Sequence, residues 1–111
     1  MKHKMGLQSK YFDCIKNGTK RIELRLFDEK RQRINIGDTI EFANPDGGKL
    51  LVRVVGLLRY GSFEDLFRDF DISILADASM TKQELLEVLN GFYPLEKQNE
   101  MGVVGIRVEV L

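Results

Sequence analysis

Alternation of apolar and polar residues predicts strands along much of the chain. Period two is clearest at residues 21–27 and 103–110, where apolar side chains recur at every second position. The other expected strands span residues 2–7, 39–43 and 50–60. Gly56, inside the last of these, is expected to mark a bulge or a sharp barrel bend.

Apolar residues at helical spacing predict helices at residues 9–16, 62–71 and 81–89. Thr81 and Glu84 form the pattern of a capping box, which opens the third helix. The elements then run strand–helix–strand, two or three strands, two helices and a final strand. Curved antiparallel strands with helices inserted between them predict an α+β fold: a small, partly open β-barrel whose helices lie between the strands and over its ends.

Length and composition limit the kind of protein. The 111 residues are expected to form one domain, residues 1–111. A single cysteine, Cys14, excludes an intramolecular disulfide and a CxxC metal site, and neither a metal nor another cofactor is expected. The longest apolar stretch, residues 50–58, is far shorter than the ~20 residues of a membrane span. No membrane association is expected, and the absence of a secretory signal pattern indicates a cytoplasmic protein.

The zero net charge hides an uneven distribution. Residues 1–60 carry 13 Lys+Arg against 7 Asp+Glu, and residues 61–111 carry 4 against 10, which together give the 17 of each sign. A basic face of this size can attract phosphates, since long-range potentials follow local patches rather than net charge. The alternative is that opposite charges pair across a solvated surface.

The candidate chemistry lies in residues 18–25, which read G-x-K-x-x-E-x-R. Alternation places Arg21, Glu23 and Arg25 on the face opposite the leucines, so Lys20, Glu23 and Arg25 are expected to converge. A Lys beside an Arg suits a phosphate or another anion. A carboxylate between them can orient the cations, accept from a base amino group or act as a general base. The alternative is an ion network that fixes the strand against the helix end.

These residues give the candidate site. The predicted ligand-binding residues are Lys20, Arg21, Glu23, Arg25 and Tyr60, and Lys20 and Glu23 are also candidates for a catalytic role. Tyr60 and Tyr93 can each stack on a base, although aromatic residues in such positions also pack in cores. The basic residues Lys30, Arg31 and Arg33 are expected at the rim of the same cleft.

The motif, together with Gly37-Asp38 before a strand and the closing Gly102–Ile106, resembles the ASCH domain (activating signal cointegrator homology) family in its short bacterial form. The resemblance spans nearly the whole chain. It implies a PUA-like β-barrel with a cleft in which the motif side chains gather. RNA or a nucleotide-like ligand is the partner that this resemblance implies.

The family also leaves two other functions open. One bacterial branch resembles amidohydrolases that act on N4-acylated cytidine through a Lys, a Thr nucleophile and a Glu. Here Lys20 matches, but Glu23 stands at the Thr position and Ala78, beside Asp77, at the Glu position. Another branch is similar to ribonucleases, whose chemistry Lys20 and Glu23 can supply. A protein-interaction adaptor, using the acidic half and the phenylalanines of residues 62–71, is the third hypothesis.

Overall fold

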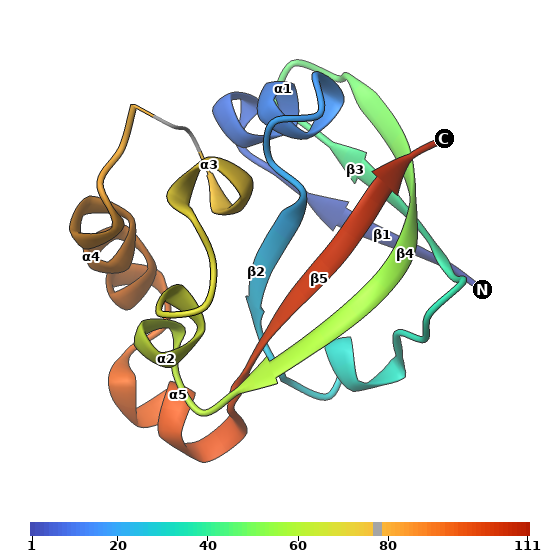
Figure 1. Cartoon of the computed structure of the whole chain (residues 1–111). Coiled ribbons are helices and arrows are strands. Elements are labelled where there is room, and N and C mark those ends of the chain that lie inside the picture. The colour runs from blue at the N-terminus through green and yellow to red at the C-terminus, as the bar shows by residue number, and fades with distance from the viewer. Residues whose placement is uncertain (77–78) are drawn as a thin grey trace.

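The computed structural model describes residues 1–76 and 79–111, and it combines a five-stranded sheet with short helices (Figure 1). The strands are β1 (Lys2–Gly6), β2 (Ile22–Leu26), β3 (Thr39–Ala43), β4 (Lys49–Tyr60) and β5 (Val103–Val110). The helices are α1 (Ser9–Lys16), α2 (Phe63–Phe67), α3 (Ile72–Leu75), α4 (Lys82–Phe92) and α5 (Leu95–Met101), with a 3-10 turn, η1 (Arg31–Arg33). The predicted α+β class is confirmed.

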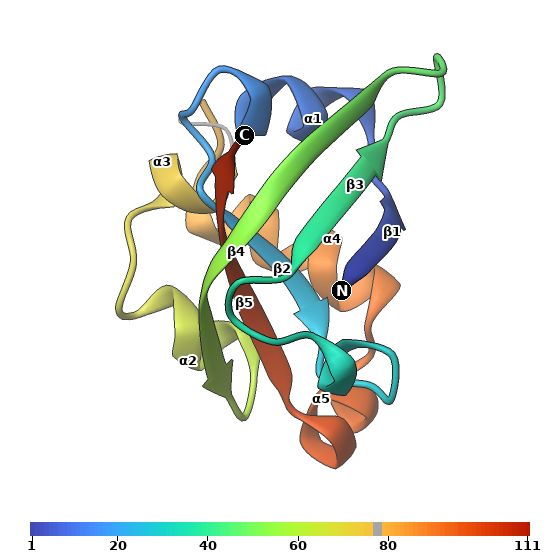
Figure 2. The same cartoon turned by 90° about the vertical axis from the view of Figure 1, so that its right-hand side faces the viewer.

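The strands form a curled sheet in the order β1-β3-β4-β5-β2 (Figure 2). β1 and β3 run parallel, and the other neighbouring pairs are antiparallel. The long strand β4 shifts register between Val54 and Gly56, where the glycine predicted an irregularity. β1 and β2 are the edges of the sheet, and Arg25 bridges them by donating from Nη2 to Gly6 O at 2.7 Å. The predicted partly open barrel is confirmed.

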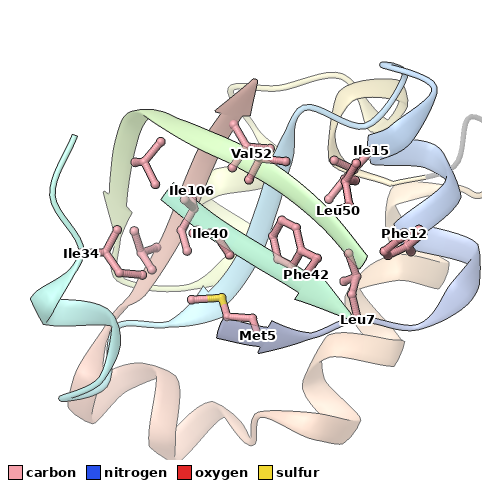
Figure 3. Close-up of a cluster of buried hydrophobic side chains, with 13 residues drawn as sticks. Met5, Leu7, Phe12, Ile15, Ile34, Ile40, Phe42, Leu50, Val52 and Ile106 are labelled. Carbon is pink, nitrogen blue, oxygen red and sulfur yellow. The ribbon is translucent and has the colours of Figure 1, made fainter. Parts of the chain in front are cut away.

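Two buried apolar clusters form the core. The first lies inside the curled sheet and under α1, and it includes Met5, Phe12 and Ile40 (Figure 3). The second lies between β2, the start of β5 and helices α2 to α4, and it includes Ile22 and Phe63. Ile22 and Leu24 of β2 belong to the second cluster, and the strand is buried from Ile22 to Leu24.

The charged face predicted for residues 21–27 is partly buried in the structure. Ile22 and Leu24 face the helices, as the alternation predicts. Glu23 takes the opposite face, but there it pairs in register with Ile106, which belongs to the cluster inside the sheet. Glu23 is only 5% exposed. The alternation is therefore confirmed, while its polar side proves to be the interior of a half-barrel.

The helices differ from the prediction in extent and number. The helix expected at residues 62–71 is shorter and ends at Phe67, and a separate helix that was not predicted, α3, begins at Ile72, where the Asp71 side chain caps it by accepting from Ser73 N. The capping box of α4 is confirmed, and the helix runs on to Phe92. Helix α5 was not predicted, because its buried residue is the polar Gln98. Among the described residues, no helix combines the length and apolar character needed to cross a membrane.

Candidate functional site

A pocket of about 500 Å³ lies between the two edges of the sheet, next to helix α4. Among the described residues, three charged side chains line it: Lys20, Glu23 and Arg25. The other lining residues are Gly6, Leu7, Gln8, Tyr11, Leu24, Ala43, Asn44, Pro45, Leu75, Leu85, Val88, Leu89, Phe92 and Tyr93. A mostly apolar pocket of this size with a few converging polar groups is typical of a small-molecule or cofactor site.

Lys20 reaches the pocket because the chain turns sharply after α1. Gly18 has a φ of +87°, a conformation that favours glycine, and Lys20 N then donates to Cys14 O at 3.0 Å. The Lys20 side chain is 3% exposed, and its Nζ donates to Ile22 O at 2.5 Å and also to Leu75 O. These bonds tie the end of α1 to β2 and α3.

Glu23 lies between the two cations. Its Oε1 is 3.4 Å from Lys20 Nζ, and its Oε2 accepts from Arg25 Nε at 2.9 Å and from Arg25 Nη2 at 2.7 Å. The Arg25 side chain is 15% exposed. The fork-shaped pairing of a guanidinium with one carboxylate holds both side chains in a fixed orientation. Lys20, Glu23 and Arg25 therefore form one ion network with a net charge of about +1.

Burial and charge act against each other on these groups. Burial lowers the pKa of Lys20 below its usual 10.5, and the neighbouring Glu23 carboxylate only partly opposes this. Burial by itself would raise the pKa of Glu23, but the charges of Lys20 and Arg25 outweigh it, so that this pKa lies below 4.5. Glu23 outweighs the effect of burial on Arg25 and raises the pKa of its guanidinium. Glu23 is thus a carboxylate at neutral pH.

The network leaves hydrogen-bonding capacity for a ligand at Arg25. The ammonium of Lys20 has three hydrogens, and two carbonyls and Glu23 stand around it. Within the described part of the chain, Arg25 Nη1 has no hydrogen-bond partner, whereas Nε and Nη2 are both engaged. Arg25 Nη1 can donate to a ligand, while Lys20 holds Glu23 in place and adds charge.

Three aromatic side chains, Tyr11, Phe92 and Tyr93, stand among the mostly aliphatic residues of the remaining wall. The Tyr11 ring centroid lies 5.7 Å from Lys20 Nζ, and the Tyr11 hydroxyl donates to Met80 Sδ at 3.8 Å. Phe92 and Tyr93 stand at the end of α4 with their ring centroids 6.4 Å apart. Phe92 is 63% exposed, so a large apolar ring is presented to solvent beside the pocket.

The predicted site residues divide into two groups. Lys20, Glu23 and Arg25 are brought together as the sequence predicts, in an ion network that also lines the pocket. Arg21 and Tyr60 do not line it. The exposed Arg21 donates from Nε to Gly18 O at 3.3 Å, and Tyr60 donates from its hydroxyl to Asp69 Oδ2 at 2.5 Å.

The basic loop predicted at the rim also lies apart from the pocket. Arg31 pairs with Asp28 at 3.1 Å and Arg33 with Glu29 at 3.2 Å, and neither arginine lines it. The alternative given for the basic half, pairing of opposite charges, describes Arg31 and Arg33, and Lys30 does not line the pocket either. Ala78 falls outside the described residues.

Three aromatic residues of the pocket were missed or only weighed in the sequence analysis. Tyr11 lies in the helix predicted at residues 9–16, and apolar periodicity alone does not show that it borders a cavity. Phe92 lay beyond the expected end of its helix at residue 89. Tyr93 is one of the two tyrosines predicted to be able to stack on a base, and its place just before Pro94, at the end of a predicted helix, was the sequence signal available.

Comparisons with known proteins agree with this fold. A family model described as ASCH domain matches residues 5–111. The crystal structure of hypothetical protein PH0355 is similar over 100% of both chains, with 40% identity and a TM-score of 0.90. The solution NMR structure of protein PF0455 from Pyrococcus furiosus is 39% identical with a TM-score of 0.82, covering 100% of this chain and 98% of the other. No curated protein matches the chain.

Proposed function

The chain belongs to the ASCH domain family, and from this premise we propose that it binds RNA or a nucleotide-like ligand in the pocket lined by Lys20, Glu23 and Arg25. The observation that carries the proposal is the joining of an oriented ion network to aromatic walls in one pocket. A nucleotide offers the matching chemistry, because it combines a flat ring with polar edges and a negative charge. We place this binding in the cytoplasm, the location that the sequence indicates.

Each part of the pocket has a complementary part in such a ligand. Arg25 Nη1 can donate to a base oxygen or nitrogen or to a phosphate. The Glu23 carboxylate, held ionised by two cations, can accept from a base amino group. Base stacking on an aromatic side chain contributes about 1–3 kcal/mol per base, and Phe92 and Tyr93, which line the pocket, can provide such a surface.

The geometry favours binding over hydrolysis. A general base needs a free lone pair, yet acceptors surround the Lys20 amino group on three sides. The charges of Lys20 and Arg25 lower the pKa of Glu23, which makes it a weak general base, and a carboxylate cannot stand in for a hydroxyl nucleophile in amide hydrolysis. The proposal therefore assigns no catalytic role to Lys20 or Glu23.

The test measures ligand binding by two matched pairs of variants. Arg25→Gln removes the pocket donor, and Arg21→Gln makes the same change on an arginine outside the pocket. Phe92→Ala removes an exposed aromatic ring at the pocket, and Leu95→Ala removes a similarly exposed apolar side chain that does not line it. Isothermal titration with the four nucleoside 5′-monophosphates and with short single-stranded RNA gives Kd values, and thermal unfolding without ligand controls for folding.

We expect Arg25→Gln to weaken binding by about tenfold or more, since hydrogen bonds to charged groups contribute about 1.5–3 kcal/mol. Phe92→Ala should weaken it by about fivefold or more. Both control variants should bind like the wild type. Equal losses in the two members of a pair, or no binding by a folded wild-type protein, would reject the proposal.

A further inference from the structure

A second feature outside the pocket is a row of cations on the outer face of the sheet. We call Lys2, Lys4, Lys49 and Arg53 the outer cation face. In register, Lys2 pairs with Thr39 and Thr39 with Arg53, while Ala43 pairs with Lys49. All four cations are exposed, whereas residues between them in β3 and β4, such as Ile40 and Val52, point into the core. Strand alternation thus places these four side chains on one surface.

The electrostatics of Glu41 supports this placement independently. Glu41 lies in the middle of the face, paired with Lys2 at 3.2 Å. The hydrogen bond from Lys2 lowers the pKa of Glu41, and the charges of Lys2, Lys49 and Lys4 lower it further. These lysines are therefore close enough to act on a single carboxylate, and one carboxylate cannot neutralise the four cations. The negative charge of Glu109, opposite Arg53, still leaves an excess of two positive charges.

The outer cation face borders the pocket. Gly6 and Ala43, the last residues of β1 and β3, line the pocket. Lys4 lies two positions before Gly6 on the same face of β1, and Lys49 is the register partner of Ala43. A chain that leaves the pocket past Gly6 and Ala43 therefore meets Lys4 and Lys49 first, and Lys2 and Arg53 farther along the strands.

The opposite side of the molecule repels an anionic chain. Residues 61–111, which carry 4 Lys+Arg against 10 Asp+Glu, supply helices α2 to α5. These helices lie on the side of β2, away from β3 (Figure 1). The charges of the two halves are thus segregated in space, and a polyanion is attracted from the sheet side.

We infer that the outer cation face binds the phosphate backbone of a single-stranded RNA while one of its nucleotides occupies the pocket. This inference rests on the proposed function and adds to it the route of the strand and the size of the ligand. Single-stranded RNA fits because its flexible backbone can follow a row of cations on exposed strands while an unpaired base leaves the stack. The face then supplies affinity that depends on chain length, and the pocket selects the inserted nucleotide.

The test compares two double variants with the same change in charge. Lys4→Glu with Lys49→Glu reverses two cations of the face, and neither lysine is a pocket residue. Arg68→Glu with Lys97→Glu reverses two exposed cations on the helical side. Fluorescence anisotropy with a labelled ten-nucleotide single-stranded RNA is measured over a range of salt concentrations, and titration with nucleoside monophosphates is measured in parallel. Lys4→Gln with Lys49→Gln replaces the first pair if charge reversal prevents folding.

We expect the face variant to weaken RNA binding by about fivefold or more at 0.1 M salt and to reduce the slope of log K against log salt by about 1.4, since each lost phosphate contact on a single strand accounts for about 0.7. Its affinity for mononucleotides should stay within about twofold of wild type. The inference alone is overturned if mononucleotides bind but the face variant leaves RNA affinity unchanged or weakens it no more than the helical variant. A wild-type protein that binds neither ligand overturns the proposed function as well.

Discussion

Glu23 organises the pocket, because two buried or nearly buried cations depend on its charge. Lys20 and Arg25 are fixed by different elements, one at the turn after α1 and the other on β2, and they meet only at this carboxylate. Pairing of this kind can add little net stability to a fold, whereas removal of one partner leaves uncompensated charge in a poorly solvated place. The network therefore sets the geometry of the pocket more than it stabilises the chain.

Replacement of Glu23 by Gln should reveal this dependence. The amide keeps the shape of the side chain but leaves Lys20 and Arg25 without a counter-charge, so we expect a loss of about 3 kcal/mol in the free energy of unfolding. Urea unfolding monitored by circular dichroism measures it. Glu41→Gln, which breaks the more exposed pair with Lys2, should cost far less. Similar losses in the two variants would contradict the buried role of Glu23.

The sequence predicted this part of the site well because the motif spacing and strand alternation are local properties. The convergence of Lys20, Glu23 and Arg25 could be predicted from the alternation of side chains along one strand and from the turn before it. Phe92 could not be found in the same way, since it reaches the pocket from helix α4, far away in the chain, and Tyr11 lies in the nearby helix α1, whose apolar periodicity does not separate core from pocket. Arg21 shows where strand alternation stops being a guide. Its position in the sequence would put it on the same face as Glu23, but the strand begins only at Ile22, so the alternation does not apply to Arg21.

Among the elements, β5 sets the tightest packing requirement. Gly105 lies where β2 and helix α2 approach the strand, and a Cβ there would stand 2.9 Å from Ile22 Cγ2 and 3.2 Å from Leu66 Cδ1. Both neighbours are buried core side chains. Gly105, part of the closing pattern that the sequence analysis noted, is thus explained by close contact rather than by an unusual backbone angle.

Gly105→Ala should therefore destabilise the fold by about 1–3 kcal/mol, the usual cost of adding a methyl group to a filled core. Thermal or urea unfolding gives the value. Gly91→Ala in helix α4 is the matched control, because nothing lies within 4 Å of a Cβ at that position. Alanine is also the better helix former, so the control should be neutral or slightly more stable. A stable Gly105→Ala protein would contradict the packing seen at β5.

Helices and strands were predicted correctly where their buried side chains are apolar and regularly spaced. The prediction failed where polar side chains determine the position of a helix. The strands and α4 carry apolar side chains at regular spacing, and the capping box marks the start of α4. Helix α5 packs through Gln98, which accepts from Phe63 N and donates to Asn90 Oδ1 and Tyr93 O. The start of helix α3 depends on the Asp71 cap. Neither polar contact leaves a hydrophobic pattern in the sequence.

For the whole molecule, the sheet edge at β1 depends on Asp38. The carboxylate of Asp38 lies 2.9 Å from His3 Nε2 on β1, and it accepts from Asn35 N at 3.0 Å in the loop before β3. The hydrogen bond with His3 is the largest cause that lowers the pKa of Asp38, from 3.8 to about 2. This one carboxylate holds the first strand and the loop against the rest of the sheet.

The pH dependence of stability follows from that shift. A carboxyl whose pKa is lower in the folded state contributes stability that is fully present above its unfolded pKa and is lost as the pH falls through its folded pKa. We therefore expect the free energy of unfolding to decrease between pH about 4 and about 2. The difference between wild type and Asp38→Asn, measured by urea unfolding at several pH values, should shrink over the same interval. A difference that is constant down to pH 2 would contradict this role.

The place of β5 in the middle of the sheet has a consequence for the order of folding. β5 lies between β4 and β2, and Ile22 pairs with Arg107, almost the whole chain apart. During synthesis, β2 therefore waits without a strand partner until the segment up to Val110 has left the ribosome. Because such distant pairings require large loops to close, folding should be slow for a chain of this size. During that time the nascent chain would expose the unpaired edge and the apolar face of β2, a state that is prone to aggregation.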